Sequence, residues 1–506
     1  QRPEWNDANN ALVGSGVSMV TLYYLRRFLN FFIKILKNDK SSSFEISTEL
    51  YHFFEKLNLS FSKINSNISN RDRKKFVDDI GEVAAEYRDR IYTSYFSGTK
   101  ELVGRDKVIN FLETAQKAIE QTIDTNKRED GLYHAYNLVN LDDNEISINR
   151  LSEMLEGQVG ILSSGYLSDD ESLSVLDSLK SSSLFWDEQY SYILYPNKDL
   201  LGFLDKNIIP ENELNKSSLL TLLVNDGNNQ IVVKDIDDKY HFNGLFHNAS
   251  CLISELENLP PEYIKLAKEE TDIILEIFEC VFDHKSFTGR SGTFYGYEGL
   301  GSIYWHMVSK LLLASVEVTQ RSIDNNSNPK TIGRLFDHYF EINEGIGVNK
   351  SPELYGAFPT DPYSHTPRGR GVQQPGMTGQ VKEDVISRFH ELGFYVNDGK
   401  ITFEPTVLRK SEFIDEEKSF KFVNLDNEIT YMDLNANSLA FTVCQVPIIY
   451  NLSDKEDIKI IANDGGEEII DGHQLNFEHS QNIFNRTNFI KAVHVRVSKW
   501  KNQFLF

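Results

Sequence analysis

The residues best suited to chemistry stand near the first position of the chain, where Glu4-Trp5-Asn6-Asp7 precedes a long amphipathic helical pattern. A carboxylate beside an indole and an amide combines a proton donor, an apolar wall that raises its pKa, and a hydrogen-bonding partner for hydroxyls. Sugars need this combination, so the stretch is a candidate sugar site. The same residues also fit an Asp that caps a helix beside a packed Trp.

A second motif, residues 373–380, reads Gln-Gln-Pro-Gly-Met-Thr-Gly-Gln and leads into a helical pattern. Thr378 and Gly379 place a hydroxyl and free backbone N–H groups at a helix N-terminus, where the helix dipole favours an anion. The motif is therefore a candidate anion site. Its alternative is a Pro-Gly turn with a capping Thr.

A third motif lies between these two, in residues 291–306, where glycines and aromatic side chains lead into an apolar helix. Tyr297 and Trp305 are candidates for contact with substrate. Glu298 suits a second carboxylate, which an inverting hydrolase places about 6.5–9.5 Å from the acid to activate water. Glu298 equally suits a carboxylate that complements the dipole of the helix it precedes.

The three motifs, in this order, resemble the loops of inverting glycoside phosphorylases of the cellobiose and chitobiose phosphorylase group, glycoside hydrolase family 94. The resemblance implies that Asp7 is the general acid and that Trp5 borders the sugar site. It also implies that Thr378 and Gly379 bind inorganic phosphate, which serves as co-substrate without a metal or an organic cofactor.

One position departs from the family pattern. Family members carry a phosphate-binding histidine about one turn before a Trp, and if Trp305 is that Trp, the matching residue here is Gly301. The imidazole then comes from elsewhere, with His306 and His365 as the candidates. A lone histidine next to an apolar helix also fits a core or surface residue.

The resemblance implies inverting phosphorolysis of a β-linked di- or oligosaccharide, a hexosyl transfer that yields a sugar 1-phosphate. One alternative is an inverting glycoside hydrolase with Glu298 as general base. A second alternative is an inactive carbohydrate-binding subunit or fragment.

The composition of the chain restricts the classes of partner, the metal sites and the location that we expect. A net charge of −23 argues against nucleic acid and anionic membranes, since both require a basic face. The three cysteines are widely spaced and suggest neither a disulfide framework nor a zinc site. No signal peptide is apparent, and the apolar stretch at residues 273–282 is too short and too charged to span a bilayer, so a cytoplasmic location is expected.

The periodicity predicts a mainly α fold followed by a small β domain. We expect a helical region over 1–392 with a partly β insertion at about 190–246, and a β domain over 393–506. The resemblance implies an (α/α)₆-toroid barrel for the helical region. Helices are predicted from residue 18 and over 45–57, 71–95, 100–125, 147–156, 169–181, 261–283, 302–319, 330–343 and 380–392.

The family places a β-sandwich and the first half of the barrel before the Trp-Asn-Asp loop, and here only a few residues precede it. The chain, similar to the family over about 4–405, therefore corresponds to a C-terminal half. It is then a fragment completed by an N-terminal half or a second chain, or an incomplete gene product. The alternative is a complete protein of another architecture.

Overall fold

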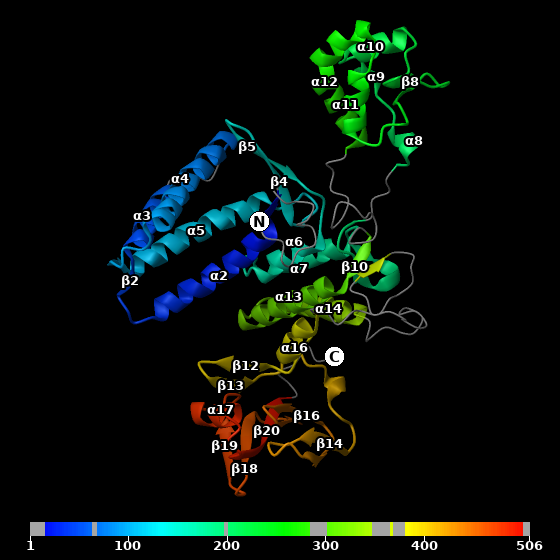
Figure 1. Ribbon diagram of the computed structural model, residues 1–506. Helices are drawn as coiled ribbons and strands as arrows, with labels where there is room; N and C mark the ends of the chain where they lie inside the picture. The colour runs from blue at the N-terminus through cyan, green and yellow to red at the C-terminus, as the bar shows by residue number, and fades with distance from the viewer. Residues whose placement is uncertain are drawn as a thin grey trace. The chain divides into compact units, whose positions relative to one another are not determined.

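The structure is a computed structural model that describes residues 16–62, 68–196, 201–283, 301–346, 365–367 and 380–498 (Figure 1). It divides into two compact units, one made of Gln1–Pro196 with Gly296–Phe506 and the other of Asn197–Tyr295. The described residues are mainly helical, as predicted.

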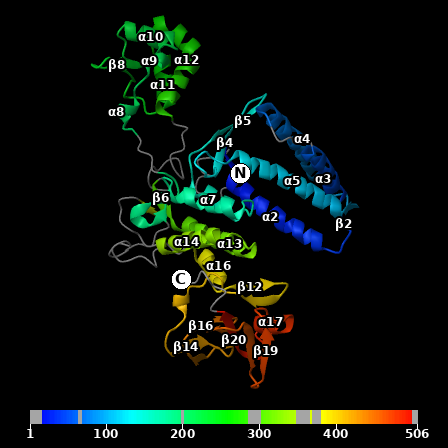
Figure 2. The same ribbon diagram turned by 180° about the vertical axis from the view of Figure 1, so that it is seen from behind.

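The first unit is built on a row of helices in which each member packs against the next. The row consists of α2 (Met19–Asn38), α6 (Leu155–Ser163), α13 (Trp305–Asp324) and α16 (Gln380–Glu391). Three further helices cover the row: α5 (Arg105–Thr125) on α2, α14 (Pro329–Gly345) on α13, and α7 (Asp169–Lys180) on α6, α13 and α14. Figure 1 and Figure 2 both show α5 running beside α2. Along the chain, the row helices alternate with the helices that cover them, which is compatible with helical hairpins. That these hairpins close into a toroid stays a prediction.

The burial of the two central helices explains their place in the row. All nine residues of α6 are buried, and α13 is buried on most of its surface, as expected of helices enclosed by neighbours. Close approach requires glycine in α6, because a Cβ at Gly160 would lie 2.8 Å from the ring of Tyr23 on α2.

Backbone hydrogen bonds fix the chain at the starts of three row helices, α2, α6 and α13. The Met19 N–H at the start of α2 donates to the Ala135 carbonyl over 2.8 Å, and the Leu155 N–H of α6 donates to the Leu194 carbonyl over 3.0 Å. The Leu194 N–H in turn donates to the Ser302 carbonyl over 2.8 Å, just before α13. The helices of the row therefore begin at a common edge.

Short antiparallel ladders reinforce this edge. They are β1 (Gly16–Ser18) with β4 (Tyr136–Leu141) and β5 (Ile146–Arg150), β6 (Phe185–Trp186) with β7 (Ser191–Tyr192), and β10 (Ser302–Tyr304) with β11 (His365–Pro367). A short 3₁₀ turn, Asp187–Gln189, connects β6 and β7.

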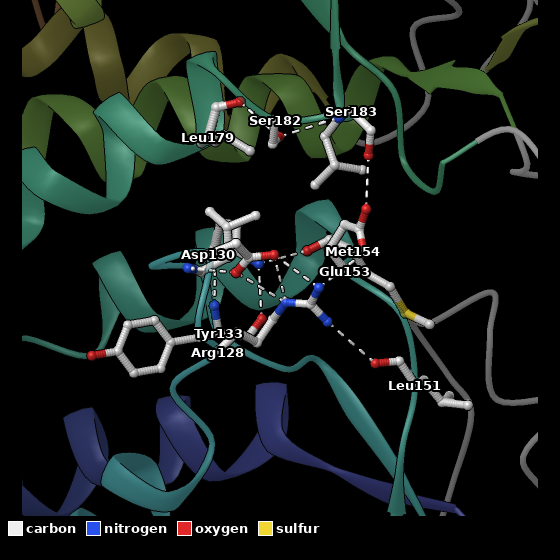
Figure 3. A network of polar contacts seen from close by, with 12 residues as sticks. Arg128, Asp130, Tyr133, Leu151, Glu153, Met154, Leu179, Ser182 and Ser183 are labelled. Atoms are coloured by element: carbon white, nitrogen blue, oxygen red, sulfur yellow. Dashed lines mark hydrogen bonds and ion pairs between the residues drawn. The ribbon is translucent and has the colours of Figure 1, made fainter.

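Near α6, an ion-pair network fixes the chain that leads into the helix. Figure 3 shows the Arg128 guanidinium between Asp130 and Glu153, at 2.8 Å and 3.1 Å from their carboxylate oxygens. The hydroxyl of Ser183 donates to the other oxygen of Glu153 over 2.7 Å. Three separate segments are thereby joined beside the start of α6.

Four predicted helices differ from the structure at their boundaries. The first three residues of the helix predicted at 302–319 form β10, and the helix itself, α13, runs on to Asp324. Residues 147–156 form β5 and only the first turn of α6, because alternating side chains at 146–150 pair with β4. The predicted helices at 45–57 and 100–125 each begin with a strand, β2 (Ser43–Ser47) and β3 (Lys100–Gly104), which pair with each other. The helices α3 (Thr48–Phe61) and α4 (Asn70–Ser94) lie between these strands in sequence.

The second unit, Asn197–Tyr295, extends well beyond the insertion expected at 190–246. It contains α8 (Phe203–Lys206), α9 (Glu211–Leu214), α10 (Ser218–Asn225), α11 (Ala249–Glu257), α12 (Pro261–Phe282) and one hairpin, β8 (Val232–Lys234) with β9 (Tyr240–Phe242). Leu220, Phe242 and Phe278 share its hydrophobic core. The periodicity of α12 identified a helix correctly but could not reveal which core the helix joins.

The C-terminal part of the first unit consists mainly of β-strands, and a separate β domain over 393–506 stays a prediction. A hairpin, β12 (Phe394–Asn397) with β13 (Lys400–Phe403), follows α16. Next come the hairpin β14 (Lys418–Val423) with β15 (Ile429–Leu434), and a five-stranded sheet of order β16-β17-β20-β18-β19. The sheet comprises β16 (Ser438–Val443), β17 (Val446–Ser453), β18 (Asp457–Ala462), β19 (Glu467–Asp471) and β20 (Ile490–Ser498). The helix α17 (Phe477–Phe484) connects β19 to β20, and a 3₁₀ turn, Lys410–Glu412, precedes β14. Within the described ranges, no helix is both long and apolar enough to cross a membrane.

Candidate active site

Most residues that the sequence analysis singled out lie outside the described part of the chain. The structure describes the side chains of Trp305 and His306 and the backbone of His365. Outside it lie Glu4, Trp5, Asn6, Asp7, Tyr297, Glu298, Thr378 and Gly379.

Trp305 and His365 are brought to the same place, the start of α13. The backbone of His365 pairs with that of Tyr304, the residue directly before Trp305. Trp305 itself is 1% exposed. A ring so deeply buried leaves no face for a pyranose, so Trp305 packs the core rather than serving the substrate contact expected from sequence.

Gly301, which stands where the resembled family has a histidine, adopts a left-handed backbone conformation with φ 61°. Its N–H donates to the Tyr195 carbonyl over 3.0 Å. Residues with a Cβ are strained at such a φ, which favours glycine here. The local backbone therefore explains why a histidine is absent from this position.

His306 and Lys310 lie one turn apart on α13 and share one face of the helix. The neighbouring positions Met307, Val308 and Ser309 are buried. Both polar side chains are therefore carried on a helix that is otherwise packed into the core, at the edge where the row helices begin.

Glu383, in the first turn of α16, faces them. Its side chain is 2% exposed, and its Oε1 lies 3.3 Å from Nε2 of His306. The same oxygen lies 3.1 Å from Nζ of Lys382, whose side chain is 70% exposed. A charged carboxylate so deeply buried requires such partners.

Further ionisable groups surround this pair. Glu156, in the first turn of α6, is 1% exposed and interacts electrostatically with Lys310. Asp384, next to Glu383 on α16, is affected by the Glu383 charge. The pKa of Tyr24 on α2 is raised, chiefly by burial, and the Glu383 charge contributes to the rise. The cluster therefore draws residues from every helix of the row.

Burial dominates the ionisation of the two α13 side chains. Burial lowers the pKa of Lys310. The charge of Lys382 lowers it further, whereas the carboxylates of Glu383 and Glu156 raise it. Burial also lowers the pKa of His306, as does the Lys310 charge, whereas Glu383 acts in the other direction. The pKa of Asp384 is raised, chiefly because burial disfavours its charged form. Perturbed, mutually coupled groups of this kind are typical of functional sites.

Chemically, the cluster can attract an anion through Lys310 and protonated His306 and can exchange a proton through His306. It lies beside the N-terminus of α16, whose first residue, Gln380, directly follows the predicted anion motif at Gly379. In the described ranges, no three His, Cys, Asp or Glu side chains are grouped to hold a metal ion.

Sequence reasoning missed Lys310, Glu383 and Glu156. A usable signal existed for Lys310, because it is a single cation inside the apolar stretch at 307–316. No local signal marks the two glutamates, since acidic residues in the first turn of a helix are common.

A cleft of about 820 Å³ lies elsewhere in this unit, between α7, α14 and residues 407–411. Its charged groups largely pair with one another. Asp177 contacts Arg334 at 2.5 Å and His338 at 2.7 Å, and the Arg409 guanidinium lies 3.9 Å from the centre of the Phe340 ring. With its charges paired and its aromatic face covered, this cleft is a poorer candidate than the start of α13.

Comparison with known proteins adds one match. Residues 200–285 are similar to the GH149 phosphorylase insertion domain 2, and this range falls within the second compact unit, Asn197–Tyr295. A search of curated proteins found no match to the chain. The insertion domain thus links the chain to the glycoside phosphorylases as a group, without singling out family 94.

Proposed function

We propose that this protein is an inverting glycoside phosphorylase that cleaves a β-linked di- or oligosaccharide with inorganic phosphate. The observation that carries the proposal is the match of residues 200–285 to an insertion domain of GH149 phosphorylases. The Lys310 ammonium beside the His306 imidazole on α13 adds support, because a phosphate nucleophile needs positive charge near its binding site.

In the proposed reaction, Asp7 donates its proton to the glycosidic oxygen. A phosphate oxygen attacks the anomeric carbon from the opposite face, so that the C–O bond to the leaving sugar breaks as the new C–O–P linkage forms. Thr378 and Gly379 hold the phosphate. The products are a sugar 1-phosphate of inverted configuration and a shortened sugar, and the reaction requires no metal or organic cofactor.

Hydrolysis is the second candidate, favoured by the glycine at position 301. Without the family histidine, a water molecule activated by Glu298 can take the place of phosphate. The variant Glu298→Gln distinguishes the two candidates. It abolishes activity if water is the nucleophile and mainly weakens substrate binding if phosphate is.

The test is to incubate the protein with a panel of β-linked disaccharides, with and without inorganic phosphate, and to separate the products. A sugar 1-phosphate that forms only with phosphate supports the proposal. Free reducing sugars formed at the same rate without phosphate would establish hydrolysis, and absence of turnover would favour a carbohydrate-binding subunit.

A further inference from the structure

One buried carboxylate connects the two polar residues of α13 with α16. Glu383 is 2% exposed, lies 3.3 Å from His306, and interacts electrostatically with Lys310. The Glu383 carboxylate lies next to Nε2 of the ring, and its negative charge favours the tautomer of a neutral His306 that carries the proton on that nitrogen. Glu383 is therefore placed to set the tautomer and the orientation of the ring.

The charge of Lys310 also depends on acidic neighbours. Its ammonium group is half-buried on a helix packed between α6 and α16. Burial disfavours the charge, and the carboxylates of Glu156 and Glu383, one from each flanking helix, favour it. Loss of either carboxylate charge makes the ammonium easier to deprotonate.

We propose that Glu383 is a positioning residue for the phosphate co-substrate: its buried carboxylate, 3.3 Å from Nε2 of His306, orients the imidazole beside Lys310 at the edge where the row helices begin. The identity of the anion rests on the proposed function. Glu383 does not touch the phosphate itself, since a carboxylate would repel it. It acts through the His306 ring and the Lys310 ammonium.

The titratable groups that act on this site come from the four helices of the row. On α13 they are His306 and Lys310, on α16 Lys382, Glu383 and Asp384, on α6 Glu156, and on α2 Tyr24. Lys100 on β3 provides a control, because it belongs to none of these helices and pairs with Glu45 through side chains that are both mostly exposed.

The experiment is calorimetric titration of the protein with inorganic phosphate at several pH values. Glu383→Gln should bind phosphate at least roughly tenfold more weakly, the scale expected when one partner of a buried charge pair is lost. Glu383→Asp, which keeps the charge, should recover part of the affinity. Lys100→Gln, in an ion pair with Glu45 whose side chains are both mostly exposed, should stay within about twofold of the wild type, because exposed ion pairs contribute little.

The pH dependence separates positioning from mere packing. In Glu383→Gln, phosphate affinity should decline at a lower pH on the alkaline side than in the wild type, because Lys310 loses its proton more readily. The ionisation of phosphate is common to all variants, so this difference reports the protein. If Glu383 had only a structural role, its loss would weaken phosphate binding without changing the pH at which the affinity declines.

The results also separate this proposal from the proposed function. If phosphate binds with the expected pattern among the variants but no sugar 1-phosphate forms, the function fails and the role of Glu383 stands. If sugar 1-phosphate forms and Glu383→Gln, folded by circular dichroism, binds phosphate like the wild type at every pH, the role of Glu383 is overturned. A wild-type protein that does not bind phosphate overturns both.

Discussion

The backbone of His365 pairs with that of Tyr304 in the antiparallel β10–β11 ladder. Tyr304 immediately precedes Trp305 and His306, so two segments far apart in the sequence meet at the first turn of α13. The buried Glu383 reaches the same turn from α16. The start of α13 is therefore where the charged cluster and the segment around His365 converge.

Asp7→Asn should lower turnover of an unactivated glycoside by roughly 10²–10⁴-fold, because the variant cannot donate a proton to the leaving oxygen. The free energy of unfolding should hardly change. Steady-state kinetics on a β-linked disaccharide, together with denaturant titration, measure both effects. Wild-type turnover in this variant would show that the acid lies elsewhere.

Gly301→Ala and Gly81→Ala should change stability in opposite directions. Gly301 has φ 61°, where a Cβ costs about 1–2 kcal/mol. Gly81 lies within α4 with open space around its Cα, so alanine should stabilise it by about 0.5–1 kcal/mol through helix propensity. Urea unfolding of both variants decides the matter. A stabilised Gly301→Ala protein would contradict the left-handed conformation on which the histidine argument depends.

How much of the fold could be read from the sequence depended on the range of the contacts involved. The apolar spacing of α2, α13 and α14 is a local feature, so these helices were predicted. The strands β2 and β5 were missed because their partners β3 and β4 decide their conformation. The membership of α12 in the second unit likewise depends on a core assembled from distant residues.

His134 should make the protein less stable in mild acid. Its pKa is lowered to about 4, first by burial and then by Arg128 and Arg150. The unfolded chain, with an ordinary histidine pKa of about 6.5, therefore binds more protons between these two values, and stability falls as the pH falls through that window. The loss by pH 4 is on the order of 2 kcal/mol.

His134→Gln should remove this part of the pH dependence, and His52→Gln, on an exposed histidine, should leave it unchanged. Urea unfolding at pH 5 and pH 8 measures the difference. An identical loss in the wild type and in His134→Gln would mean that other groups cause the acid sensitivity.

Arg128→Met should destabilise the fold by about 2 kcal/mol, because Asp130 and Glu153 lose the donor between them. Lys100→Met removes an ion pair with Glu45 in which both side chains are mostly exposed, so its effect should stay within about 0.5 kcal/mol. Thermal and urea unfolding of the two variants test the contrast. Equal effects would show that the network in Figure 3 contributes no more than a surface pair.

The candidate site shows the same division between local and distant information. A glycine-flanked Thr before a helix and a carboxylate beside a Trp are recognisable one motif at a time. The pairing of Glu383 with His306 joins residues on separate helices and becomes visible only when α13 packs against α16. The burial of Trp305 is equally a property of the assembled row.

The central claim is that phosphate is the nucleophile. The most direct measurement is proton and phosphorus NMR of the wild-type protein acting on β-linked di- and oligosaccharides in phosphate buffer. We expect an α-configured sugar 1-phosphate to appear as the β-linkage disappears, at a rate that saturates with phosphate concentration. Release of free sugar alone, at a rate independent of phosphate, would contradict the account.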